Sequence, residues 1–60
     1  MPVITIEGAR LNKEQKRELV MTLTKDAANI IKVSEDHFIV LVKENSKENI
    51  GIGGILAADQ

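Results

Sequence analysis

The run HFIVLVKE, residues 37–44, places five consecutive apolar residues between a histidine and two charged residues. Short apolar runs rich in β-branched side chains are typical of buried strands. Successive side chains of a strand point to opposite faces, so both faces of this strand are apolar. One face carries Phe38, Val40 and Val42, and the other carries Ile39 and Leu41. We therefore expect a strand over residues 37–44 that needs cover on both sides.

The segment PVITIE, residues 2–7, is rich in β-branched residues and predicts an earlier strand. Ile4 and Ile6 are expected on one face of this strand, and Val3 on the other. Its apolar side chains, like those of residues 37–44, therefore fall on both faces.

Residues 13–32 repeat their apolar side chains at three- and four-residue spacing, which predicts an amphipathic helix. Asn12 and Gln15 predict a capping box at its start. Residues 34–36 predict a turn or one short helical turn. The apolar stripe consists of Leu19, Val20, Leu23, Ala27, Ile30 and Ile31. A strand, a long helix and a strand in this order predict a β-α-β unit with parallel strands and a right-handed crossover.

The carboxyl-terminal part begins with a polar loop over residues 45–49. Three glycines follow within residues 50–55, and they predict a small hairpin or bulged ribbon. A phosphate-binding loop is disfavoured there, because no Gly-Lys-Ser/Thr sequence and no long helix follow. Residues 57–60 are expected to be a tail.

The expected fold class is α/β (α+β), a single domain over residues 1–60. It is a β-α-β protomer with a short C-terminal hairpin. One helix covers one face of the strands, so the other face must be buried by another copy of the chain.

A core of this size supplies little stability. With no cysteine and a single histidine, the chain has neither disulfides nor a multi-histidine metal site to add to it. Oligomerisation is the remaining means of stabilisation.

Composition argues against several functions. The chain has 8 basic and 9 acidic residues and one aromatic residue, Phe38, which disfavours nucleic-acid binding. No apolar run reaches the roughly 18 residues of a membrane span. The start Met1-Pro2-Val3 lacks the basic and long apolar regions of a signal peptide. We expect a cytoplasmic protein without a metal, a cofactor, or nucleic-acid or membrane partners.

Pro2 is the strongest candidate for chemistry. Methionine followed by a small residue is a start that methionine aminopeptidases trim, and trimming gives Pro2 a free secondary amine. An ordinary α-amino group has a pKa of about 7.7–8.0. An apolar pocket or a neighbouring cation lowers that pKa toward the range useful for abstracting a proton next to a carbonyl. The alternative is structural, because a strand start tolerates the missing N–H of proline. His37 is expected to be a partly exposed edge residue.

Short motifs along the chain strengthen the catalytic interpretation. They are Met1-Pro2, Glu7-Gly8 with Arg10 just beyond, Glu14-Gln15-Lys16, Glu44, and Gly51-Ile52-Gly53-Gly54. In this combination the chain resembles the 4-oxalocrotonate tautomerase family over nearly all of its length. The resemblance implies two protomers that form a four-stranded sheet, and three such dimers in a hexamer. It also implies an isomerase that moves a proton in enol or dienol and keto acids. Pro2 would be the general acid/base, and Arg10 would bind a substrate carboxylate, which suits a guanidinium.

The chain departs from the family pattern at the substrate site. The family's second arginine falls at Ile39, its aromatic wall falls at Ile50, and Arg10 follows Ala9 rather than the glycine directly. Lys43 and Lys47 are candidates for a second cation. A substrate with two carboxylates is therefore poorly supported, and a smaller or monocarboxylic substrate is an alternative.

Two other functions stay open. One is a hydratase or dehalogenase of the same superfamily, which would use protonated Pro2 as an acid. The other is a non-catalytic, self-assembling domain that keeps Met1.

Overall fold

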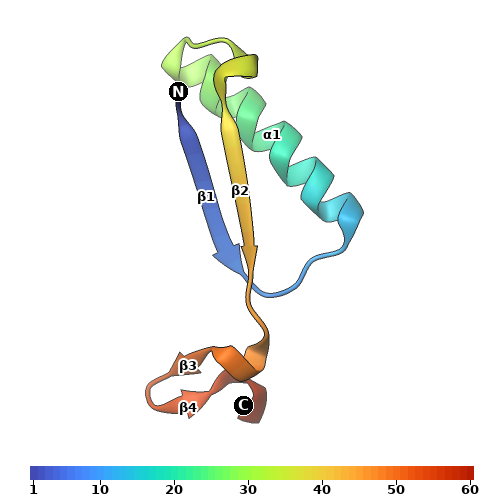
Figure 1. Ribbon diagram of the computed structural model, residues 1–60, viewed down its shortest axis with the longest axis vertical. Coiled ribbons are helices and arrows are strands. Elements are labelled where there is room, and N and C mark those ends of the chain that lie inside the picture. Colours follow the sequence, from blue (N-terminus) through green and yellow to red (C-terminus); the bar gives the residue numbers. More distant parts are fainter.

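The computed structural model describes residues 1–60 and shows a strand, a helix and a strand, followed by a small hairpin (Figure 1). Strand β1 (Val3–Gly8) and strand β2 (Ile39–Glu44) are parallel, with Val3 beside Ile39 and Gly8 beside Glu44. Helix α1 (Lys13–Ile31) connects them. The predicted β-α-β unit is thus confirmed.

Helix α1 is capped at both ends. The Asn12 side chain accepts the N–H of Gln15 at 2.8 Å, and the Gln15 side chain accepts the N–H of Asn12 at 3.0 Å. This confirms the predicted capping box. At the other end, Lys32 adopts a left-handed conformation (φ 66°), and its N–H donates to the carbonyl of Ala28 at 2.9 Å. This C-cap ends the helix at Ile31.

Strand β2 begins at Ile39, so the prediction of a strand from His37 is wrong by two residues. Residues Glu35–His37 form a 3₁₀ turn instead. The N–H groups of His37 and Phe38 donate back to the carbonyls of Ser34 and Glu35, each at 3.1 Å. Because these donors are used within the turn, they do not join the ladder of the sheet.

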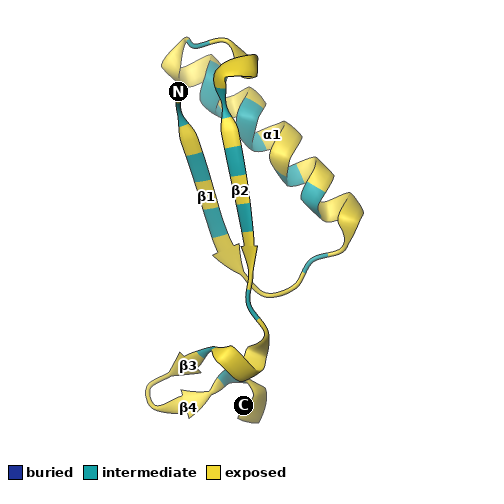
Figure 2. Ribbon diagram, in the orientation of Figure 1, coloured by how far each residue is buried: buried dark blue, intermediate teal, exposed yellow.

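The two faces of the sheet differ in burial, as the alternating colours along β1 and β2 show (Figure 2). The inner face, toward α1, carries four half-buried aliphatic side chains: Ile4, Ile6, Val40 and Val42. The outer face carries Val3, Ile39 and Leu41, which are 50%, 39% and 44% exposed. The predicted division of the two faces is confirmed, and the outer face has no cover within one chain.

The hairpin lies beyond the end of the sheet (Figure 1). It consists of strands β3 (Gly51–Ile52) and β4 (Ile55–Leu56), which are antiparallel. Gly53 and Gly54 have φ values of 61° and 87°, as a two-residue type I′ turn requires. Residues 57–60 are not a simple tail, because Ala57–Asp59 forms a 3₁₀ turn and the Ala57 N–H donates to the Ile50 carbonyl at 2.7 Å.

The chain as a whole has no fully buried residue. Its radius of gyration is 14.6 Å and its extents are 43 × 23 × 14 Å. A compact chain of this length has a radius of gyration of about 10 Å. The shape is therefore that of a thin layer with a protruding hairpin. None of its helices combines the length and apolar character that a membrane crossing requires.

Candidate active site

Pro2 lies at the start of β1 and is half-buried. Its carbonyl accepts the N–H of Ile39 at 3.0 Å, which joins it to the start of β2. Proline has no N–H to contribute, and none is needed at this position. In the chain with Met1, the nitrogen of Pro2 is an amide nitrogen. Met1 is 85% exposed and therefore accessible to an aminopeptidase.

Polar groups from the 3₁₀ turn lie beside the amino terminus. Met1, Asp36, His37 and Ile39 line a hollow of about 400 Å³, here called the amino-terminal hollow. The Ser34 hydroxyl donates to the Asp36 carboxylate, and this bond is the main reason that the pKa of Asp36 is lowered. A backbone hydrogen bond and the charge of His37 lower it further. The amino-terminal hollow thus contains a carboxylate whose pKa is lowered, where the sequence predicted only a turn and an edge residue.

Arg10 lies at the opposite end of the sheet, in the segment between β1 and α1. It is exposed and forms no ion pair. It lines a hollow of about 390 Å³ together with Ala9, Asn45, Ser46 and Lys47, here called the Arg10 hollow. Of the two lysines considered as a second cation, Lys47 is in this hollow and Lys43 is not.

Glu44, the last residue of β2, fastens the segment that carries Arg10. Its Oε1 lies 2.6 Å from Lys16 Nζ, and its Oε2 accepts the N–H of Leu11 at 2.8 Å. The pKa of Glu44 is lowered, first by the hydrogen bond from Lys16 and then by that from Leu11. The sequence motifs included Glu44 and Lys16 without giving either a role. Their opposite charges were the only signal of a pair.

The structure does not bring Pro2 and Arg10 together within one chain. They lie beyond opposite ends of β1, whose six residues span about 17 Å at roughly 3.3 Å per residue. Ile39 lies on the Pro2 end, and Ile50 lies near the hairpin, where its N–H donates to the Lys47 carbonyl at 3.4 Å. One chain therefore contains two separate halves of the predicted site.

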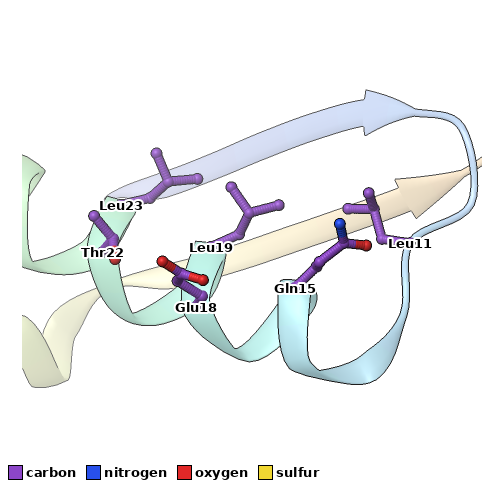
Figure 3. A pocket seen from close by; sticks show the side chains of 6 residues that line it. All are labelled: Leu11, Gln15, Glu18, Leu19, Thr22 and Leu23. Atoms are coloured by element: carbon purple, nitrogen blue, oxygen red, sulfur yellow. The ribbon is translucent and has the colours of Figure 1, made fainter.

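A third hollow, of about 360 Å³, lies along α1 (Figure 3). Leu11, Leu19 and Leu23 form its apolar part, and Gln15, Glu18 and Thr22 form its polar edge. Here it is called the leucine hollow. It contains neither Pro2 nor Arg10. The chain has no group of three or more His, Cys, Asp or Glu side chains that could hold a metal ion.

Comparisons with known proteins agree on one family. The profile of the Tautomerase family, described as tautomerase enzyme, matches residues 2–60. The crystal structure of DmpI from Archaeoglobus fulgidus is 40% identical, with a TM-score of 0.88 over 97% of this chain and 100% of that chain. A 4-oxalocrotonate tautomerase homologue is 28% identical, with a TM-score of 0.91 over 100% of this chain and 97% of that chain. YwhB, another homologue of that enzyme, is 27% identical, with a TM-score of 0.91 over 98% of each chain. No curated protein matches the sequence.

Proposed function

The chain belongs to the tautomerase enzyme family, and on that premise we propose that it isomerises enol or dienol acids to keto acids, with the amine of Pro2 as general acid/base. The observation that carries this proposal is the position of Pro2. It is held at the end of the sheet by the Ile39 N–H, next to a hollow, behind an exposed methionine.

Removal of Met1 is the step that creates the base. The secondary amine then takes the proton of the enol hydroxyl as the carbonyl forms, and it returns a proton to a carbon of the same substrate. An α-amino group suits this exchange, because its ordinary pKa of about 7.7–8.0 lies close to ambient pH. Neither proton transfer changes the oxidation state of the substrate, so the reaction needs no redox partner.

The complete site is formed between copies of the chain. Arg10 of one copy supplies the cation that the Pro2 of another copy lacks, since the two residues lie at opposite ends of β1. A homo-oligomer is also favoured by the absence of any buried residue and by the exposed outer face of the sheet. Both strands have a free edge, and the leucine hollow leaves apolar side chains of Leu11, Leu19 and Leu23 without cover in one chain. Two protomers joined there into a four-stranded sheet, and three such dimers in a hexamer, would cover these surfaces.

The first experiment is intact mass spectrometry of the native protein, which we expect to show a chain that begins at Pro2. The second compares wild type with Pro2→Ala on an enolic acid such as 2-hydroxymuconate. After trimming, alanine leaves a flexible primary amine in place of the rigid ring amine, and a misplaced base should lower kcat by about 100-fold. Size-exclusion chromatography should show an unchanged assembly.

A matched control keeps every side chain and removes only the amine. An additional residue placed before Pro2, of a type that aminopeptidases do not trim, turns its nitrogen into an amide. This extended chain should be less active than Pro2→Ala, because it has no amine at this position. Full turnover by the extended chain would contradict the proposal, and retention of Met1 in the native protein would favour a non-catalytic domain.

A hydratase or dehalogenase that uses protonated Pro2 is the second candidate. Asp36 favours it, because this carboxylate shares the amino-terminal hollow with Met1, and an anion close to an amine stabilises the protonated form. The pH dependence of kcat/KM separates the two. Activity that rises with pH indicates a base, and activity that falls with pH indicates an acid.

A further inference from the structure

The amino-terminal hollow adjoins the nitrogen on which the proposed reaction depends. Met1 is bonded to the nitrogen of Pro2. It lines the hollow together with Asp36, His37 and Ile39. Removal of Met1 empties the space that its atoms occupied, so the hollow then extends to the freed amine. The part of a substrate that lies beyond this amine therefore shares the hollow with those three side chains.

The amino-terminal hollow carries a negative charge and has no lysine or arginine to balance it. Asp36 is its one carboxylate, and the Ser34 hydroxyl donates a hydrogen bond to it. That bond lowers the pKa of Asp36 below its ordinary value, so the carboxyl group is ionised at neutral pH. Ile39 is apolar, and His37 is the only lining side chain that can become a cation. At pH 8 an ordinary imidazole, with a pKa of about 6.5, is neutral and leaves the carboxylate unopposed.

The turn that carries Asp36 holds this charge in place relative to the amino terminus. The last N–H groups of the 3₁₀ turn are bonded within it, and the next one, that of Ile39, donates to the Pro2 carbonyl at 3.0 Å. The hydrogen bond from Ser34 fixes the carboxylate on this backbone. An anion in a fixed position can discriminate between substrates, whereas a freely moving side chain would turn away into water.

We propose that Asp36 determines substrate specificity: it disfavours a second carboxylate at the Pro2 end of the site and so selects enol acids whose distal end is uncharged. This inference rests on the proposed function and extends it to the substrate class. Two carboxylates in one hollow repel each other, and the repulsion grows as water is displaced. Pro2 is uncharged in the form that accepts a proton, so it does not offset the charge of Asp36 before the transfer.

The kinetic test compares Asp36→Asn with wild type on 2-hydroxymuconate, which has a distal carboxylate, and on a 2-hydroxydienoic acid without one. We expect wild type to prefer the monocarboxylate. Asp36→Asn should raise kcat/KM for the dicarboxylate, relative to that for the monocarboxylate, roughly 2- to 5-fold, the size of an interaction between exposed unit charges. Added salt should reduce this difference between the two proteins. Asparagine keeps an oxygen that accepts the Ser34 hydroxyl, so the turn is preserved.

The matched control is Glu35→Gln, which removes the same charge from the neighbouring residue of the turn. The Glu35 side chain lines a different hollow, together with Lys25 and Asp26 of α1. This variant should therefore keep the substrate preference of wild type. An equal change of preference in both variants would overturn the inference, because it would show an effect of net charge and not of the amino-terminal hollow.

A second measurement, on the chain that begins at Pro2, needs no turnover. Iodoacetate and iodoacetamide alkylate an amine by the same step, in which the nitrogen lone pair forms the N–C bond, iodide leaves and the amine proton passes to water. The chain has no cysteine to compete for these reagents. At pH 8, peptide mapping should show that Asp36→Asn raises the rate of labelling of Pro2 by the anionic reagent, relative to the neutral one, roughly 2- to 5-fold. Glu35→Gln should leave this ratio unchanged.

The two measurements separate the inference from the proposed function. A labelling ratio that Asp36→Asn leaves unchanged would overturn the inference, and so would an unchanged preference between the two acids. If wild type turns over neither acid while Asp36→Asn changes the labelling ratio, the proposed reaction is wrong and the charge selection at the amine stands. If wild type turns over both acids and Asp36→Asn does not alter their ratio, the inference is wrong and the proposed function stands.

Discussion

At the scale of single residues, one peptide bond decides whether Pro2 is a base. While Met1 is attached, the ring nitrogen is an amide and has no lone pair to offer. The Pro2 carbonyl accepts the Ile39 N–H at 3.0 Å, and this hydrogen bond does not involve the ring nitrogen. The place of Pro2 in the sheet therefore does not depend on its nitrogen. Removal of Met1 changes only whether that nitrogen can accept a proton.

Glu44 makes stability depend on pH. Its pKa is lowered in the folded chain, mainly by the hydrogen bond from Lys16 and then by the Leu11 N–H. A depressed carboxyl pKa adds stability above the unfolded value of about 4.3, and this contribution is lost as the pH falls through the folded value. Wild type should therefore lose stability on acidification, and Glu44→Gln should lose less. Urea unfolding at a series of pH values measures both.

The control for this prediction is Glu18→Gln, which removes a carboxylate that forms neither an ion pair nor a hydrogen bond. This variant should keep the acid dependence of wild type. Identical pH profiles for Glu44→Gln and wild type would show that the contacts of Glu44 with Lys16 and Leu11 add no stability.

At the scale of elements, the start of α1 supports the Arg10 segment. The capping box fixes the backbone at Asn12, directly after Leu11, and the first turns of the helix place Lys16 against Glu44. The start of α1 and the walls of the Arg10 hollow therefore depend on the same contacts. Loss of the cap should make both more mobile.

Asn12→Ala removes the acceptor for the Gln15 N–H, which lies at 2.8 Å. We expect it to lower the free energy of unfolding by about 1 kcal/mol, as measured by urea unfolding. Asn12→Ser keeps an acceptor at the N-cap and should lose much less. Equal stability of the two variants would mean that the cap hydrogen bond does not stabilise α1.

At the scale of the whole molecule, one helix covers only one face of the sheet. The inner face of the sheet is covered by α1, and the outer face exposes Val3, Ile39 and Leu41. Two strands with one helix are marginally stable alone, because they bury too little apolar surface to offset chain entropy. The stability of this fold is therefore expected to depend on protein concentration.

Leu41→Asp tests the outer face. Leu41 is 44% exposed, and a buried, unpaired carboxylate at this position costs several kcal/mol in an assembly that covers it. We expect the variant to elute as a smaller species in size-exclusion chromatography with light scattering. Met21→Asp places the same charge on α1 at a side chain that is 64% exposed, and it should assemble like wild type. An unchanged mass for Leu41→Asp would mean that the outer face is not an interface.

Local sequence signals predicted most of the elements, because those elements depend on local interactions. Alternation placed Ile4 and Val40 on the inner face, and the Asn12–Gln15 spacing identified the helix start. The carboxyl terminus was mispredicted as a tail because the bond from Ala57 to the Ile50 carbonyl closes a turn across the hairpin. The late start of β2 followed from hydrogen bonds internal to the 3₁₀ turn, which compete with the sheet for the same donors.

The candidate site, like the fold, was predicted only in part from the sequence. The residue types of Pro2 and Arg10, and the family resemblance, are properties of the sequence. Their separation is a property of the extended strand between them, since six residues that would span about 7.5 Å in a helix span about 17 Å in β1. Two hollows bring together residues that are distant in the chain. One contains Met1 and Asp36, and the other contains Arg10 and Lys47.

The sequence by itself determined the β-α-β order, the apolar character of both sheet faces and the presence of a proline that processing can turn into a base. These follow from side-chain periodicity and from chemistry that each residue carries alone. Only the tertiary structure decided that Glu44 holds the Arg10 segment and that Lys47 shares its hollow. The reason is physical: parallel pairing of β1 with β2 sets which chain ends are neighbours, and no local pattern encodes that register.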